Sequence, residues 1–85
     1  MKGDFKIANI KANYVGRKVY EVTIGKHTER FYEPLFKNAE NCSSRIIDLA
    51  ENFSICDIKV SVEQVWIALS LAAEKAGKKF PDLIF

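Results

Sequence analysis

The chain has 85 residues, a length that allows one domain (residues 1–85) and leaves no room for a separate catalytic module. Its apolar content of 48% and charged content of 28% are those of a folded globule, which excludes wholesale disorder. The net charge of +2 is unevenly divided, because residues 1–37 carry 8 basic and 4 acidic groups whereas residues 38–85 carry 5 and 7. The first half is therefore basic and the second half mildly acidic.

The apolar runs and the cysteines indicate where such a chain works. No signal-peptide pattern follows Met1, and the longest apolar run, Val65–Ala73, is about half the length that spans a bilayer. We therefore expect a cytoplasmic protein with no membrane contact. Cys42 and Cys56 lack the spacing of metal ligands, and in a reducing compartment both are expected to be structural thiols.

Alternating apolar and polar residues predict an antiparallel β-ribbon of two or three strands over about residues 5–33. Gly16–Lys18 predicts a turn, since glycine supplies the positive φ that tight hairpins need. Tyr20–Ile24 alternates as a half-buried second strand does. A further turn is expected at Gly25–Thr28, followed by a short third strand over residues 30–33.

Two points in the ribbon stay open at this level. The apolar residues change parity near Ala8 and Asn9, which predicts a bulge or a bend in the first strand. The main hairpin can turn at either Gly16 or Gly25. If it turns at Gly25, the first strand is an additional element outside that hairpin.

The strongest pattern in the chain lies between Leu35 and Phe53. Apolar residues recur there at intervals of three and four on one helix face: Leu35, Ala39, Cys42, Ile46, Leu49 and Phe53. The pattern predicts a helix that begins at about Leu35 or Ala39 and ends near residue 54. Asn38 is the candidate N-cap for the later start, because its side chain can accept from a free backbone N–H.

A second helix is predicted over about residues 61–76. Ser61 followed by Gln64 forms a capping box, and Gly77 is a residue type that commonly ends a helix. Trp66 and Leu69 belong to apolar rows that cover more than one narrow face of this helix. The apolar tail at residues 80–85 is expected to fold back on the core or to pair with another chain.

The residues that could carry chemistry are few. His27 is the only histidine, has no cysteine near it in sequence, and is expected to be a solvated turn residue rather than a metal ligand. A nucleophilic pair with Cys42 is disfavoured, since that thiol lies in an apolar stripe. We therefore expect no enzymatic activity, no metal and no cofactor.

Two kinds of partner remain. The basic ribbon interleaves lysines and arginines with Tyr14, Tyr20, Phe31 and Tyr32, a combination typical of surfaces that bind single-stranded nucleic acid. Tyr20, however, lies on the same face of its strand as the apolar residues that follow it, and it is therefore expected in the core. The two helices and the ribbon together offer more apolar surface than one internal interface buries, which predicts a homodimer that uses the stripe, Trp66 and Leu69 as core or contact residues.

Several short motifs occur together in a familiar order: Gly16-Arg17 at a turn, Ala39-Glu40, Arg45-Ile46-x-x-Leu49, Val62-Glu63-Gln64 and the Ala/Leu-rich run Ala68–Glu74. In this order they resemble the globular head of the ZapA family, over about residues 6–76. Members of that family are bacterial cell-division proteins that associate with the tubulin-like FtsZ and cross-link its filaments. Here Gly77 interrupts the helix that usually continues into a coiled coil in the family.

The resemblance implies a function and a set of contact residues. It makes the chain a non-enzymatic, self-associating module that binds a filament-forming partner such as FtsZ. Arg17 and Glu63 match family positions that contact this partner, and we add Lys18 because it lies beside Arg17. Nucleic-acid binding by the basic ribbon is the alternative. The expected fold class is α+β, with the ribbon packed against two helices in ββ(β)αα order.

Overall fold

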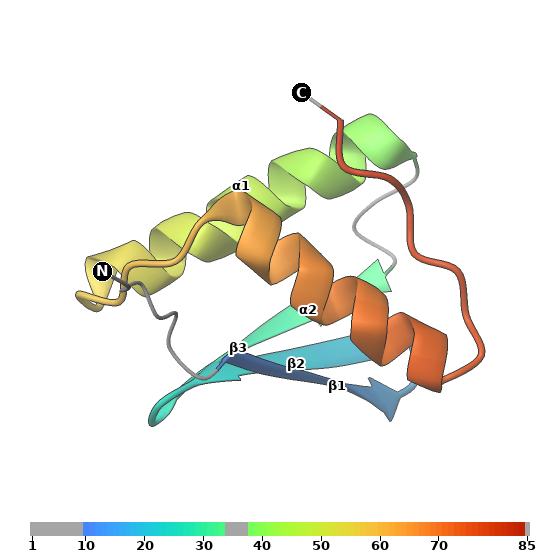
Figure 1. The fold of residues 1–85 in the computed structure, drawn as a ribbon, viewed down its shortest axis with the longest axis horizontal. Helices are drawn as coiled ribbons and strands as arrows, with labels where there is room; N and C mark the ends of the chain where they lie inside the picture. Colours follow the sequence, from blue (N-terminus) through green and yellow to red (C-terminus); the bar gives the residue numbers. More distant parts are fainter. Residues whose placement is uncertain (1–9, 34–37, 85) are drawn as a thin grey trace, which may run out of the picture.

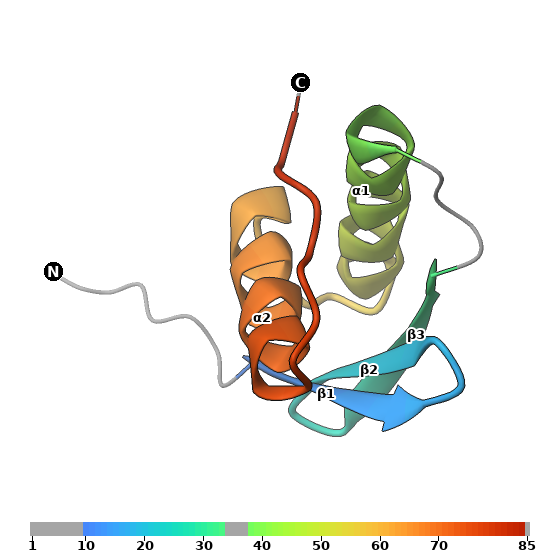
Figure 2. The ribbon, with the colours of Figure 1, turned by 90° about the vertical axis from the view of Figure 1, so that its right-hand side faces the viewer.

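A computed structural model describes residues 10–33 and 38–84 of the chain. Both helices lie side by side on one face of a three-stranded antiparallel sheet (Figures 1 and 2). The elements are β1 (Ile10–Gly16), β2 (Val19–Ile24), β3 (His27–Tyr32), α1 (Ala39–Ile55) and α2 (Val62–Lys75). The predicted α+β fold with ββ(β)αα order is therefore confirmed.

The sheet has the strand order β1-β2-β3, and two short hairpins connect the strands. The first hairpin turns at Arg17 and Lys18, which both have positive φ, as does the preceding Gly16. For a non-glycine residue this conformation costs on the order of 1 kcal/mol. Gly25, with a φ of 63°, begins the second turn. Each glycine thus marks one of the two hairpins of the sheet.

The third strand differs from the prediction. It begins at His27 and runs for six residues, so His27 and Thr28 belong to the strand rather than to the turn. The reason is that a two-residue connection is enough to reverse an antiparallel strand. Pairing shifts register between Tyr14 and Gly16, whereas the bulge expected near residues 8 and 9 lies outside the described residues.

The first helix begins at Ala39, the later of the two predicted starts. The Oδ1 atom of Asn38 accepts a hydrogen bond of 2.7 Å from the backbone N–H of Asn41, which confirms the predicted N-cap. Within the apolar stripe the structure buries Cys42, Ile46, Leu49 and Phe53, while Ala39 is half-buried and Leu35 lies outside the described residues. The stripe therefore forms core from Cys42 to Phe53.

The second helix begins with the predicted capping box. Ser61 Oγ accepts from the Gln64 N–H at 3.1 Å, and Gln64 Oε1 accepts from the Ser61 N–H at 2.9 Å. Helix α2 packs mainly on β1, while α1 packs on β3 and α2. Leu69 is buried, and Trp66 is half-buried with its indole N–H donating to the Pro81 carbonyl at 2.8 Å.

The C-terminal tail folds back along the helices, from the end of α2 to the start of α1 (Figure 1). Phe80 is buried, and its ring meets the ring of Tyr20 edge to face at 5.7 Å and lies 6.0 Å from that of Phe31. Near the end of the tail, the N–H of Ile84 donates to Ser43 Oγ at 2.8 Å. The tail thus closes one side of the core within the same chain.

We predict that Phe80→Ala lowers the free energy of unfolding by about 3 kcal/mol, because it removes a buried ring and leaves a cavity beside Tyr20. Urea denaturation followed by Trp66 fluorescence measures this change. Ile84→Ala is the matched control, since that side chain is 43% exposed in the same tail. A similar, small effect of both substitutions would show that the tail does not pack on the core.

Candidate functional site

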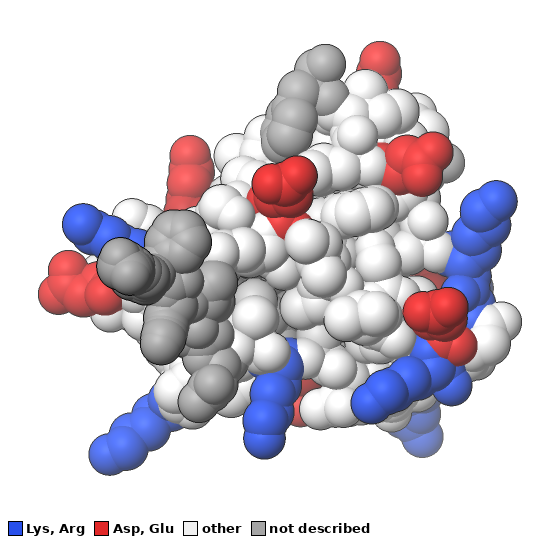
Figure 3. Space-filling view, in the orientation of Figure 1, with Lys and Arg blue, Asp and Glu red and all other residues white. Residues whose placement is uncertain are grey.

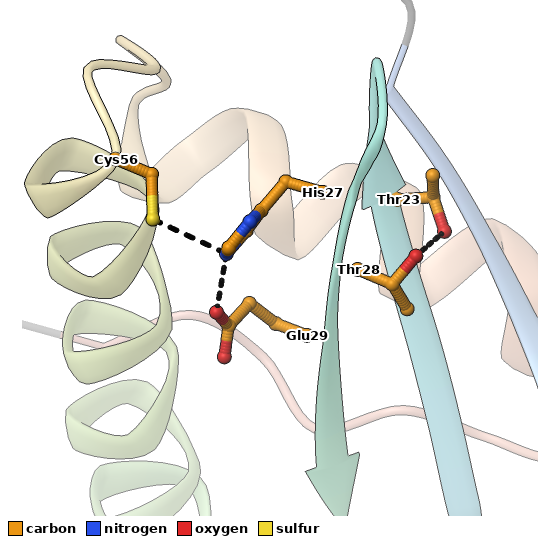
Figure 4. A network of polar contacts seen from close by, with 5 residues as sticks. All are labelled: Thr23, His27, Thr28, Glu29 and Cys56. Atoms are coloured by element: carbon orange, nitrogen blue, oxygen red, sulfur yellow. Dashed lines mark hydrogen bonds and ion pairs between the residues drawn. The ribbon is translucent and has the colours of Figure 1, made fainter.

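Three side chains with reactive or titratable groups meet where α1 ends above the sheet (Figure 4). The Nε2 atom of His27 lies 2.8 Å from Glu29 Oε2 and 3.4 Å from Cys56 Sγ. His27 and Glu29 are two residues apart on β3, so both point toward the helices. Cys56 is the C-cap of α1, and its backbone N–H donates to the carbonyl groups of Phe53 and Ser54.

The imidazole ring is held from two sides. Glu29 contacts Nε2, and the fully buried ring of Phe53 meets the imidazole edge to face, with centroids 5.6 Å apart and planes at 72°. An ionised carboxylate only accepts hydrogen bonds, and therefore the short contact with Glu29 requires a proton on Nε2. Nε2 carries only this one proton, so Cys56 Sγ lies 3.4 Å from a nitrogen whose N–H is already engaged by Glu29.

The prediction that His27 is a solvated turn residue is wrong. The ring is half-buried at the start of β3 and contacts a cysteine that is 29 positions away in sequence. Only the packing of α1 on the sheet brings the two together. The sequence held one signal for the inward position of His27. Residues 27, 29 and 31 alternate along the chain and so lie on one face of a strand, and residue 31 is an apolar phenylalanine.

The geometry limits what this cluster can do. In a proton-relay triad the nucleophile and the carboxylate contact opposite nitrogens of the histidine, whereas here both contact Nε2. The cluster is therefore not a hydrolase triad. Among residues 10–33 and 38–84, no group of three His, Cys, Asp or Glu side chains is arranged to hold a metal ion.

The two cysteines have opposite environments. Cys56 is exposed, while Cys42 is buried in the core. Burial raises the pKa of the Cys42 thiol from its ordinary value of 9.0 to about 12. Burial, followed by the charge of Glu33, also raises the pKa of Tyr20 above its ordinary value of 10.0, and the Tyr20 hydroxyl donates to Glu33 Oε2 at 3.2 Å.

A second candidate site is a groove of about 500 Å³ between β1 and α2. Its lining is mainly apolar and carries charged groups of both signs: Ile10, Lys11, Ala12, Asn13, Ala68, Leu71, Ala72, Glu74 and Lys75. Leu71 is 56% exposed, and Ile67, one helical turn before it on α2, is 46% exposed. The side of the molecule that Figure 3 faces is mostly uncharged over its middle, with lysines and arginines around its margin.

The residues predicted to contact a partner do not form one site in a single chain. Arg17 and Lys18 are exposed at the first hairpin turn, close to the C-terminal end of α2, where the Lys78 ammonium lies 5.0 Å from the Tyr14 ring centre. Glu63 lies in the first turn of α2. A rise of 1.5 Å per residue puts it roughly 18 Å from the other end of that helix.

The structure also shows which of the ribbon's aromatic side chains, the feature that suggested nucleic-acid binding, are buried and which are exposed. Tyr20 and Phe31 are buried, which confirms the inward position predicted for Tyr20. Tyr14 is half-buried and packs on Tyr20 at 5.0 Å, so that Tyr32 is the one exposed aromatic side chain in the part of the ribbon that the structure describes. A stacking platform on this sheet would therefore have a single ring.

Comparison with protein-family models, with curated proteins and with solved structures finds no match to this chain. The resemblance to the ZapA head therefore stays a prediction. No helix in the described part of the chain is long and apolar enough to cross a membrane.

We predict that the stability of the protein falls as the pH rises above about 9, where the unfolded chain loses the Cys42 proton that the folded chain keeps. The unfolded state then binds fewer protons, and by about pH 10 the loss from this group is on the order of 1 kcal/mol. Urea denaturation at several pH values measures the slope. Cys42→Ala should flatten the profile in this range, and an unchanged slope in that variant would contradict the assignment.

Proposed function

We propose that the chain is a non-enzymatic interaction module that self-associates through the groove between β1 and α2. In the dimer, β1 pairs antiparallel with β1 of a second copy. The two three-stranded sheets then form one continuous sheet, and the two α2 helices lie side by side above the junction. The observation that carries this proposal is a pair of exposed apolar side chains, Ile67 and Leu71, beside an edge strand.

The exposed apolar surface supports association. Burial of a leucine or isoleucine side chain stabilises a complex by about 1.5–3 kcal/mol when it is complete. Ile67 and Leu71 lie on α2 beside Ala68 and Ala72, which are buried and line the groove. The apolar residues Ile10 and Ala12 of β1 continue this surface into the groove.

The position of β1 supports the same arrangement. β1 pairs only with β2 in the described sheet, so its other side presents backbone N–H and C=O groups that another strand can pair with. A two-fold axis beside this strand brings two copies together through one surface, as closed homodimers require. Because α2 packs mainly on β1, the same axis brings the two α2 helices together.

The charges in the groove favour a second copy over a different partner. Lys11 and Lys75 supply positive charge, and Glu74 supplies negative charge on the same lining. A two-fold axis can place Glu74 of one chain against a lysine of the other, which makes the groove complementary to itself. A partner of uniform charge would leave one sign unpaired.

We predict that the protein forms a dimer in sedimentation equilibrium and that Leu71→Asp raises the dissociation constant about tenfold or more, because the carboxylate loses water on association. Ile55→Asp is the matched control, since Ile55 is 81% exposed and lies on α1, outside the groove. Circular dichroism would verify that both variants fold. A monomer at all concentrations, or equal weakening by both substitutions, would contradict the proposed interface.

We further propose, from the resemblance to the ZapA head, that the partner is a filament-forming protein such as FtsZ and that the first hairpin contacts it. Arg17 and Lys18 are exposed and keep an unfavourable backbone conformation, a combination that clusters at binding sites. Antiparallel pairing of β1 puts the two first hairpins at opposite ends of the joined sheet. One dimer then presents two contact sites and can bridge two filaments without a coiled coil.

Co-sedimentation with FtsZ filaments at micromolar concentration tests this partner. We expect the protein to pellet with the filaments and Arg17→Glu to reduce the pelleted fraction several-fold, because the substitution reverses a charge at the contact. Lys59→Glu is the control, an exposed charge reversal in the loop between the helices. Failure to pellet would reject the partner. Binding to single-stranded oligonucleotides that falls steeply with salt would instead support the nucleic-acid alternative.

A further inference from the structure

We propose that the sheet face turned away from the helices docks a short acidic segment of a partner protein, and that apolar side chains of this segment pack on Val15, Val19 and Tyr32. The inference rests on the proposed function of the chain as an interaction module. It adds the chemistry of the segment that the partner presents to the first hairpin. The contact is separate from the exposed side chains of α2 that the proposed dimer buries.

Both helices and the tail lie on one side of the sheet, so that the described part of the chain leaves the other side open (Figure 2). Successive side chains of a strand point to opposite faces, and Tyr20, Val22 and Phe31 are buried on the inner face. The residues that alternate with the inward side chains therefore form the outer face of the sheet, which consists of Lys11, Asn13, Val15, Val19, Glu21, Thr23, Thr28, Arg30 and Tyr32.

The strand register separates polar from apolar residues on the outer face. Thr23 is opposite Thr28, and their hydroxyl oxygens lie 2.9 Å apart. At the end beside the first hairpin, Val19 is opposite Tyr32, and Val15 lies at the register shift of the neighbouring strand. Val15 is 52% exposed and Tyr32 is 40% exposed. These three side chains, Val15, Val19 and Tyr32, form an apolar row that meets solvent.

Basic side chains lie beside this apolar row. Arg17 and Lys18 are exposed in the turn between β1 and β2, and no carboxylate of the described residues pairs with either of them. Arg30 lies on the same face of β3, and its Nε atom is 3.4 Å from Glu21 Oε2. The charge that stays unpaired around the row is therefore positive, and carboxylates of a partner complement it.

The combination of an apolar row with unpaired cations favours an acidic protein segment over the other occupants. A nucleic acid would meet a single aromatic ring here, and its phosphate backbone has no apolar groups to cover the two valines. A second copy of the chain would leave Arg17 and Lys18 without carboxylates. The reason is that Glu21 is the one acidic residue among the described positions of the outer face, and Arg30 already engages it.

The test measures the binding of two fluorescein-labelled peptides to the full-length protein by fluorescence anisotropy. One peptide carries Phe-Leu-Phe between two pairs of glutamates, and the control peptide has serine in place of the three apolar residues, so that both carry the same charge. We expect the apolar peptide to bind at least about tenfold more tightly, because only it buries side chains on the row. Equal affinities would overturn the proposal.

Substitutions locate the contact on the protein. Tyr32→Ser and Val15→Ser should each weaken binding of the apolar peptide about fivefold and leave the control peptide unaffected, whereas Arg17→Glu should weaken both peptides. Ile55→Ser is the matched control, since Ile55 is 81% exposed and lies on α1. Circular dichroism verifies that each variant folds. Unchanged affinity in the folded Tyr32→Ser and Val15→Ser variants would overturn the proposal.

These measurements use no FtsZ, so that their failure is distinguishable from failure of the proposed partner. Binding of the apolar peptide by a protein that does not pellet with FtsZ supports the docking face and rejects that partner alone. A protein that pellets with FtsZ but binds neither peptide overturns the docking face and leaves the FtsZ contact intact. Tighter binding of a single-stranded oligonucleotide than of the apolar peptide would also overturn the proposal.

Discussion

Phe53 joins three parts of this molecule, and the arrangement of the candidate site depends on its burial. The side chain has no exposed surface, and it fixes the last turns of α1 in the core between the sheet and α2. Its backbone carbonyl accepts from the N–H groups of Cys56 at 3.0 Å and Ile58 at 2.9 Å, which orders the chain as it leaves the helix. Its ring packs against His27. Removing this side chain would loosen the helix end and the cluster beside it together.

The distribution of apolar surface explains why one helix faces inward while the other offers an interface. The stripe of α1 is narrow, and the sheet, α2 and the tail bury it from Cys42 to Phe53. The apolar residues of α2 cover a wider arc. Leu69 is buried on the inner side of this helix, whereas Ile67 and Leu71 remain exposed. The surplus that suggested self-association therefore lies on α2, at the edge of the sheet, and not on the stripe of α1.

The candidate sites differ in how far the sequence could reveal them. The positions of Arg17 and Glu63 follow from local signals, since one lies in a hairpin turn and the other lies within a capping box. Their separation along α2 is a consequence of helix length and packing. The cluster at His27 could not be found in this way, because Cys56 follows it by 29 positions and a local pattern carries no information over that distance.

The order of elements, the caps at Asn38 and Ser61, and the apolar face of α1 can be read from the sequence, because these depend on contacts within a few residues. The predicted start of the third strand was wrong, because turns of two and of four residues have similar amino-acid compositions. Three features arise only from the tertiary packing: the tail covers Tyr20, the groove lies between β1 and α2, and Cys56 meets His27. Each of these depends on how α1 and α2 settle on the sheet, which is governed by the packing of the whole core.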